Sequence, residues 1–144
     1  MKPLISVISV NYNGYWLTCA MVESLRRHVT APLEIIVVDN GSARDEAAML
    51  RERYPGIKAL RSERNLGFAG GNNLGFAAAA GDYLLLLNND TEVITPGWLE
   101  EMVMYAQQKR VGCVGAKLLY PDDTIQHAGI GFGIGGVAGH LHKY

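Results

Sequence analysis

The chain has 144 residues, which is enough for one ordinary domain but hardly for two. Hydrophobic residues make up 49% of it and charged residues 19%, so the composition indicates a globular domain with a real core and excludes a disordered or collagen-like chain. The 13 basic and 14 acidic residues leave a net charge of -1, which disfavours a protein that binds nucleic acid through excess positive charge.

No apolar run approaches the roughly 20 residues that a membrane-spanning helix needs. The apolar stretch Leu4–Val10 is short and leads into Asn11 rather than a signal-peptide cleavage site, so we expect a cytoplasmic protein. The two cysteines, Cys19 and Cys113, lack the CxxC spacing of a zinc ribbon and are expected to be reduced core residues.

The first part of the chain predicts a strand, a helix and a second strand. Leu4–Val10 is an apolar, β-branched run closed by the turn-forming residues Asn11–Gly14. From Trp16 to Val29 apolar residues recur at helical spacing, and charged residues fall on the other face. A second buried strand is expected over Leu33–Val38, followed by the polar residues Asp39–Ser42, which favour turns and helix caps.

The middle of the chain predicts two more helices around a weaker strand. Ser42 followed by Asp45 is close to a capping box, which predicts that a helix begins there. A third strand is expected at Ile57–Leu60. The glycine-rich loop Asn65–Asn73 then leads into an alanine-rich helix that ends at Gly81.

The last part begins with the most hydrophobic strand, Tyr83–Leu87, which we expect at the centre of the sheet and which stops at the polar residues Asn88–Asp90. A helix over Trp98–Gln108 and a strand over Val111–Leu119 are expected next. The glycine-rich tail, Ile125–Tyr144, predicts a loop or an edge hairpin.

Strands and helices alternate along the chain, which predicts βαβ units and a three-layer α/β/α fold with a mostly parallel sheet. In open sheets of this kind, ligands bind outside the carboxyl ends of the strands. Polar clusters end three of the predicted strands, at Asn11–Asn13, Asp39–Ser42 and Asn88–Asp90. We therefore expect these three clusters to converge on one crevice.

Two acidic residues at this edge have alternative interpretations. Asp39 is either a helix cap or a group whose carboxylate accepts the N–H of a flat heterocycle such as a pyrimidine. Asp90 is either a turn residue or a ligand for Mg²⁺ or Mn²⁺, which take a few carboxylate oxygens together with phosphate oxygens of a ligand.

Other motifs carry less weight. Gly131, Gly133 and Gly136 fit GxGxxG, but too little sequence follows them for the helix and the ribose-binding acid of a dinucleotide site. The chain has neither a P-loop nor a GxSxG elbow. His140 and His142 lie on the glycine-rich tail, where we expect exposed histidines rather than metal ligands.

Together, these segments resemble family 2 glycosyltransferases with the A-type, nucleotide-sugar-binding fold (GT-A). ISVISVNYNG is similar to the family's opening strand and turn, and EIIVVDNGS to its second strand. NLGFAGGNNLGFAAAAGDYLLLLNND resembles the family's loop, helix and metal-binding strand. LLLLNNDT, with GAKLLYPDDTIQHAG behind it, is similar to the rhamnosyltransferase-like branch, so the resemblance covers nearly the whole chain.

The resemblance also implies a set of site residues. Tyr12 and Asp39 would contact the nucleotide, and Asp90 would hold the divalent cation as the last acid of a DxD motif. Asn88 replaces the first acid of that motif, and Asn72 stands where many members carry an arginine. The nucleotide-binding residues implied in this way are Asn11, Tyr12, Asn13, Asp39, Asn65, Gly67, Asn72, Asn88 and Asn89.

The family's second half has no counterpart that we identify. Members continue into an acceptor-binding half with an acidic motif that supplies the general base, and nothing after Tyr120 resembles it. Asp122 and Asp123 lie in a turn that suits a hairpin and lacks the apolar surroundings that raise a carboxyl pKa. We expect a nucleotide-sugar-binding domain over residues 1–120 and, over 121–144, a glycine-rich hairpin or tail leading to an absent acceptor-binding half, with the general base unknown.

The implied function is that of a hexosyltransferase donor domain. It would bind a dTDP- or UDP-sugar with Mg²⁺ or Mn²⁺, for inverting transfer to a saccharide or lipid-linked acceptor in polysaccharide biosynthesis. One alternative is a non-catalytic nucleotide-sugar-binding or assembly module. Another is a sugar-phosphate nucleotidyltransferase, which would need a basic loop in place of Asn11–Tyr15. Peripheral membrane association of a full-length protein and a homo-oligomer are left open.

Overall fold

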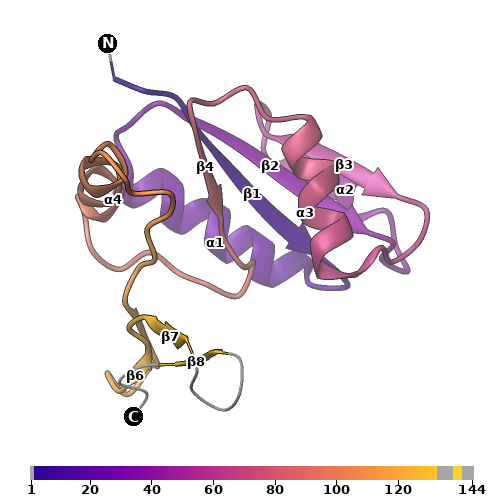
Figure 1. Cartoon of the computed structure of the whole chain (residues 1–144). Helices are drawn as coiled ribbons and strands as arrows, with labels where there is room; N and C mark the ends of the chain where they lie inside the picture. The colour runs from indigo at the N-terminus through magenta and orange to yellow at the C-terminus, as the bar shows by residue number, and fades with distance from the viewer. Residues whose placement is uncertain (1, 133–137, 141–144) are drawn as a thin grey trace. The chain divides into compact units, whose positions relative to one another are not determined.

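The computed structural model describes residues 2–132 and 138–140, which belong to two compact units, Met1–Gly97 and Trp98–Tyr144. The first unit is built on a parallel sheet of β1 (Ile5–Asn11), β2 (Leu33–Asn40), β3 (Lys58–Ser62) and β4 (Tyr83–Leu86), in the order β3-β2-β1-β4 (Figure 1). The predicted alternation of strands and helices is confirmed. The expected domain boundary after residue 120 lies later than this division and stays a prediction.

Helices cover both faces of this sheet. Helices α1 (Tyr15–His28) and α2 (Glu46–Arg53) lie on one face, and α3 (Gly67–Ala77) lies on the other (Figure 1). Because side chains of a strand alternate between faces, Ile8 and Val10 of β1 meet α3, whereas Asn11 meets α1 and α2. This alternation places the polar end of β1 under the helices α1 and α2.

Two glycines let α3 approach the sheet closely. A Cβ atom at Gly75 would overlap the Ile8 side chain, and one at Gly71 would lie 2.9 Å from Cγ1 of Val10. The core on this face is apolar, because Ile8 and the neighbouring Val38 are fully buried. The expected loop over Asn65–Asn73 is therefore wrong from Gly67 on, because its glycines pack within α3 against the sheet, and the helix ends at Ala77 rather than at Gly81.

The strand β4 is where the sequence-based expectation fails most clearly. It pairs with β1 alone among the described residues, so it is an edge strand rather than the central one. Its side chains Leu84 and Leu86 are 44% and 57% exposed. Hydrophobicity indicates how much apolar surface a strand carries, not how many neighbours cover it.

The second unit contains α4 (Trp98–Ala106) and two antiparallel pairs: β5 (Leu118–Leu119) with β6 (Ile125–His127), and β7 (Ile130–Phe132) with β8 (Ala138–His140). The expected strand over residues 111–119 is wrong except for β5. Cys19 is buried as expected, but Cys113 is exposed.

The turn at residues 121–124 joins β5 to β6, with Tyr120 N donating to Thr124 O at 2.8 Å, so the predicted hairpin is confirmed. Of the tail residues singled out above, Gly133, Gly136 and His142 lie outside the described residues. Among the described residues, no helix has the length and apolarity required to cross a bilayer.

Candidate active site at the carboxyl edge of the sheet

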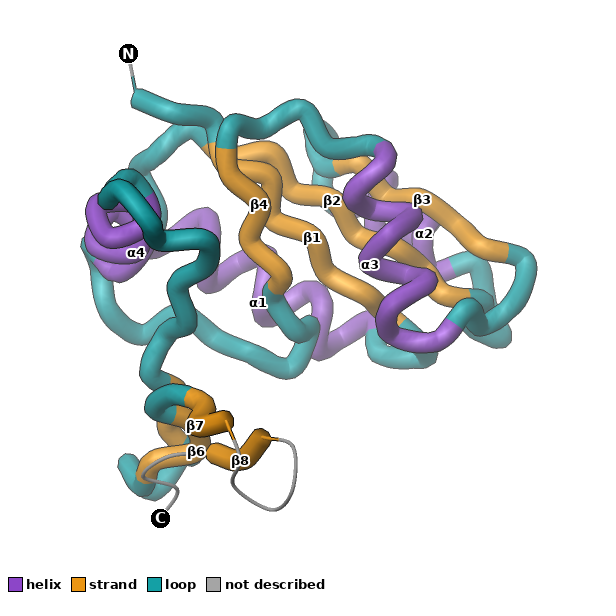
Figure 2. Tube along the Cα trace, viewed as in Figure 1, coloured by secondary structure: helices purple, strands orange, loops and turns teal. Residues whose placement is uncertain are grey.

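The carboxyl ends of β1, β2 and β4 form one edge. Asn11 is in register with Asp39, and on the other side of β1 the backbone N–H of Leu87 donates to Ile8 O at 3.0 Å. The loops that follow β1 and β4 lie at the same, lower edge in Figure 2. The strand order reverses at this point, because β2 lies on one side of β1 and β4 on the other. Open α/β sheets bind their ligands at such a reversal.

A buried network joins the first and third polar clusters. Asn11 is fully buried, and its Oδ1 accepts hydrogen bonds from Thr18 Oγ1 at 2.9 Å and from Asn89 Nδ2 at 3.3 Å. Asn89 Nδ2 also donates to Thr18 Oγ1 at 3.1 Å. The network ties the end of β1 to α1 and to the segment after β4, which confirms that these clusters converge. Because Asn11 is fully buried, it positions Thr18 and Asn89 at this edge.

A second set of bonds joins the first cluster to the second. The backbone N–H of Asn13 donates to Ser42 Oγ at 2.8 Å, and the N–H of Ala43 donates to Asn13 Oδ1 at 2.9 Å. Asn13 has φ 52°, in the left-handed region that asparagine tolerates better than most residues. Its neighbour Tyr12 is 53% exposed, so the phenol ring is available to a ligand.

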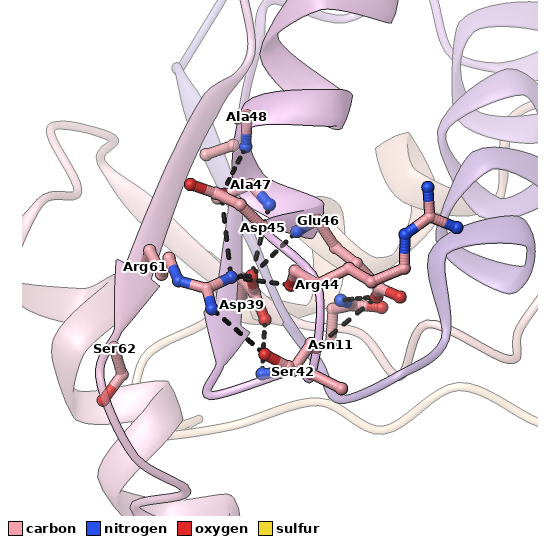
Figure 3. Close-up of polar contacts among 12 residues, drawn as sticks. Asn11, Asp39, Ser42, Arg44, Asp45, Glu46, Ala47, Ala48, Arg61 and Ser62 are labelled. Carbon is pink, nitrogen blue, oxygen red and sulfur yellow. Dashed lines mark hydrogen bonds and ion pairs between the residues drawn. The ribbon is translucent and has the colours of Figure 1, made fainter.

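Asp39 is the most heavily bonded carboxylate of the edge (Figure 3). It is fully buried; Oδ1 accepts from Ser42 N at 3.0 Å, and Oδ2 from Glu46 N at 3.1 Å and Ala47 N at 3.3 Å. Arg61 Nη1 lies 2.6 Å from Oδ2 and also donates to Arg44 O at 2.7 Å. Asp39 therefore anchors the N-terminus of α2 and forms an ion pair, which is the helix-cap alternative; contact with a base stays a prediction.

The start of α2 differs in detail from the expected capping box. Asp45 is the N-cap residue, and its Oδ1 accepts from Ala48 N at 2.8 Å. Ser42 instead donates through its hydroxyl to Glu46 Oε2 at 3.4 Å while accepting from Asn13. Ser42 therefore joins two loops of the site rather than capping the helix, because the carboxylate of Asp39 already holds its backbone N–H.

Asn40 positions the loop that precedes α3. Its Nδ2 donates to Asn65 Oδ1 and to Gly67 O, both at 3.1 Å, and its Oδ1 accepts from Leu66 N at 2.9 Å. Asn65 and Gly67 are thus brought beside the end of β2. Asn72 is 8% exposed, and its Nδ2 donates to Phe68 O at 2.9 Å, one turn earlier in α3. That bond occupies part of the amide that was expected to contact the nucleotide.

Asp90 and Asn88 are exposed where the chain leaves β4. The Asp90 carboxylate has no hydrogen-bond or ion-pair partner among the described residues, so it is available as a ligand. No three His, Cys, Asp or Glu side chains in the described ranges are grouped as a metal cage would require. These residues fit a cation such as Mg²⁺ or Mn²⁺ only as a site completed by phosphate oxygens of a ligand.

Two charged residues of the edge were missed from the sequence. Glu46 is 7% exposed, and its Oε2 accepts from Asn11 Nδ2 at 2.7 Å and from Gly14 N at 3.2 Å. Arg61, near the end of β3, forms the ion pair with Asp39. A sequence signal existed for Glu46, because it follows directly on the expected helix start and acidic residues favour the first turn.

In the turn of the second unit, the contacts of Asp122 shift its pKa in the direction opposite to that of a tuned general base. The hydroxyl and the backbone N–H of Thr124 both donate to Asp122, at 2.6 Å and 3.1 Å. These bonds lower the pKa of Asp122 below its ordinary value. A carboxylate with a lowered pKa is a weaker proton acceptor, so this turn does not supply a tuned base.

Known proteins are similar to this chain in sequence and in fold. Residues 6–129 match the model of Glycosyl transferase family 2. The chain is 44% identical to an uncharacterized protein, y4gI, of Sinorhizobium fredii, and 39% identical to the O-antigen biosynthesis protein RfbC of Myxococcus xanthus. These matches cover 97% and 96% of this chain but span 16% and 11% of the two relatives.

Among solved structures, the chain resembles a mannosyltransferase of Pyrobaculum calidifontis in complex with GDP-Man and Mn²⁺, with a TM-score of 0.71, 21% identity, and coverage of 85% of this chain and 37% of that one. It also resembles S. aureus TarS in complex with UDP, with a TM-score of 0.60, 26% identity, and coverage of 74% and 32%. The fold is thus of the GT-A type. The chain belongs to glycosyl transferase family 2.

Proposed function

We propose that this chain is the donor-binding part of a glycosyltransferase and binds a dTDP- or UDP-sugar at the carboxyl edge of its sheet. The observation that carries the proposal is the bonded convergence of three strand ends at the point where the strand order reverses. Solved relatives bound to GDP-Man and to UDP support a nucleotide donor.

The exposed groups of the edge have distinct tasks in this proposal. The ring of Tyr12 packs against the base and ribose. Asp90 holds a divalent cation together with the diphosphate, as Mn²⁺ in the mannosyltransferase complex supports. When bound, the cation supplies positive charge that stabilises a leaving diphosphate. Asn88 and Asn89, which directly precede this acid in the chain, position the diphosphate.

Base selection by Asp39 has a structural condition. Oδ1 accepts a single N–H, from Ser42, and so retains acceptor capacity, whereas Oδ2 is surrounded by two N–H groups and Arg61. The Arg61 side chain is 34% exposed and is the part of this arrangement that can move. In our proposal Asp39 accepts the N3–H of uracil or thymine after Arg61 shifts.

The reaction that we propose is inverting transfer to a saccharide or lipid-linked acceptor, in polysaccharide assembly. The relative named for O-antigen biosynthesis supports that setting. A second candidate function is a binding module without catalysis, and it is favoured by the exposed turn in which Thr124 already occupies the Asp122 carboxylate. The two candidates share the donor site and differ in whether these residues contain a general base.

A competition experiment tests the proposal. The chain is titrated with UDP, dTDP and ADP in Mn²⁺, followed by calorimetry, and then with UDP-sugars under conditions that reveal hydrolysis. We expect UDP and dTDP to bind more tightly than ADP, because adenine has no N–H matching that of a pyrimidine N3. Equal affinity for ADP would remove Asp39 from base selection. Hydrolysis of a UDP-sugar by this chain would exclude the binding-module candidate.

A further inference from the structure

A cavity of about 510 Å³ lies beside the proposed donor site, between the N-terminal turn of α1 and the loop that leads into α2. It shares one residue, Asn13, with the set expected to bind the nucleotide. Its walls include the aromatic side chains Tyr15 and Trp16, the guanidinium-bearing Arg44, and Glu46. The volume is within the range of pockets that hold small organic ligands.

Glu46 lines this cavity, and only one of its two carboxylate oxygens accepts hydrogen bonds from the described residues. All three hydrogen bonds that its carboxylate accepts from the described residues end on Oε2. Oε1 accepts no hydrogen bond from the part of the chain that the structure describes, and it is not fully enclosed. The residue is 7% exposed, so this carboxylate is held in place and largely dehydrated. A ligand hydroxyl would satisfy the free oxygen.

The opposite charge is supplied by Arg44. Its backbone carbonyl accepts from Arg61, but its guanidinium has no hydrogen bond or ion pair among the described residues. Figure 3 shows this side chain extending away from the pair of Asp39 and Arg61. A guanidinium presents parallel N–H groups that match a carboxylate. Arg44 therefore favours an anionic group on the ligand.

Trp16 adds an aromatic surface to the cavity. Trp16 is 71% exposed although it lines the cavity; the Arg53 guanidinium lies 5.8 Å from its ring centroid, and the Tyr15 ring packs edge-on with 4.9 Å between centroids. A large exposed aromatic surface beside a polar cavity gains from covering by a flat, C–H-rich face such as that of a pyranose ring. An acidic sugar carries all three groups that these residues would bind: a hydroxyl, a carboxylate and a C–H face.

We propose that this cavity binds a saccharide unit that carries a carboxylate, as a site separate from the donor site. Glu46 Oε1 accepts a sugar hydroxyl, Arg44 binds the carboxylate, and Trp16 packs on the ring. The choice of a saccharide rests on the proposed function, whereas the preference for an acidic unit rests on Arg44 alone. The site would hold an acidic glycan beside the donor.

The probes are methyl glucuronide and, as a neutral control, methyl glucoside, followed by the indole N–H signals of the two tryptophans in NMR spectra. We expect the Trp16 signal to shift saturably and the glucuronide to bind about 3- to 10-fold more tightly than the glucoside. Arg44→Gln should remove that preference without changing glucoside binding. Arg27→Gln, an exposed arginine on α1 away from the cavity, should leave both affinities unchanged.

Donor binding is measured in parallel with UDP and Mn²⁺, so that the two proposals fail separately. Loss of UDP binding with glucuronide binding intact would overturn the donor site but not this one. Absence of any Trp16 shift would overturn this site, as would an Arg44→Gln variant that keeps the full preference. Displacement of the glucuronide by UDP would show that the cavity is part of the donor site, which also overturns the inference.

Discussion

Replacing Asp39 by asparagine tests whether this carboxylate holds the edge together. Asp39→Asn keeps the size of the side chain but removes the charge that faces Arg61 Nη1 at 2.6 Å, and it turns one acceptor into a donor. Its neighbours at 3.0 to 3.3 Å are backbone N–H groups, so the new amide N–H would face a donor. All the neighbours of the carboxylate are donors, so none of them can accept a hydrogen bond from this amide N–H.

The loss of stability in Asp39→Asn can be bounded from the geometry. Removing one partner of a buried ion pair typically costs about 3 to 5 kcal/mol, but Arg61 is 34% exposed and regains water, so we expect a loss of about 2 to 4 kcal/mol in the free energy of unfolding. Urea unfolding measures it. Arg61→Gln and the double variant complete a cycle, in which we expect a coupling energy of about 1 to 3 kcal/mol.

Asp90→Asn is the matched control, because it makes the same chemical change at an exposed carboxylate and should alter stability by less than about 0.5 kcal/mol. If Asp39→Asn costs no more than this control, Asp39 does not hold the edge and the reasoning is refuted. The result also matters for function, since nucleotide binding by an Asp39 variant is informative only where that variant is shown to be folded.

Four further predictions follow from other residues. The Lys58 ammonium, with the Ser6 hydroxyl and the Ala80 N–H, lowers the pKa of Glu34 from 4.5 to about 2. The stability that the ionised Glu34 contributes to the fold is therefore lost as pH falls from about 4.5 towards 2. In Glu34→Gln, the midpoint of urea unfolding should depend less on pH over that range. Ser9 is fully buried and its Oγ has no hydrogen-bond partner in the described ranges, so Ser9→Ala should be neutral or stabilising in thermal unfolding, whereas Thr18→Val should cost about 1 to 3 kcal/mol. Gly75→Ala should cost about 1 to 3 kcal/mol in urea because its Cβ overlaps Ile8, while Gly112→Ala, in open space, should cost far less; similar losses would contradict the close approach of α3. Finally, we expect this chain to bind donor but to transfer no sugar at an appreciable rate, since a positioned base contributes about 10² to 10⁴-fold and none is apparent among the described residues. Appreciable transfer of sugar to an acceptor by this chain would contradict this.

The fold could be predicted from the sequence because its signals are local. The apolar runs of β1 and β2 are bounded by turn residues, and helical periodicity separates them. The position of β4 in the sheet is a long-range property, and a run of leucines indicates burial without saying which neighbours provide it. The same holds for residues 111–117, where apolar residues form no strand.

The convergence of the strand ends was predicted from the sequence, but their contacts were predicted only in part. Asn11, Asp39 and Asn89 were singled out because they follow strands, and two of them do meet across the edge. Their hydrogen bonds, however, are mostly to each other and to the helices, which strand ends alone do not indicate. Glu46 and Arg61 were missed because each acts through a partner about twenty residues or more away in the chain, Asp39 or Asn11, and pairing at that distance depends on the fold.

Calorimetric titration of the chain with UDP or dTDP, in Mn²⁺ and in EDTA, tests the central claim most directly. We predict measurable binding in Mn²⁺ that weakens in EDTA, and an Asp90→Asn variant that remains folded but no longer distinguishes the two conditions. Failure of both UDP and dTDP to bind in Mn²⁺, or a full response to the metal in Asp90→Asn, would contradict the assignment of a metal-dependent donor site to the carboxyl edge.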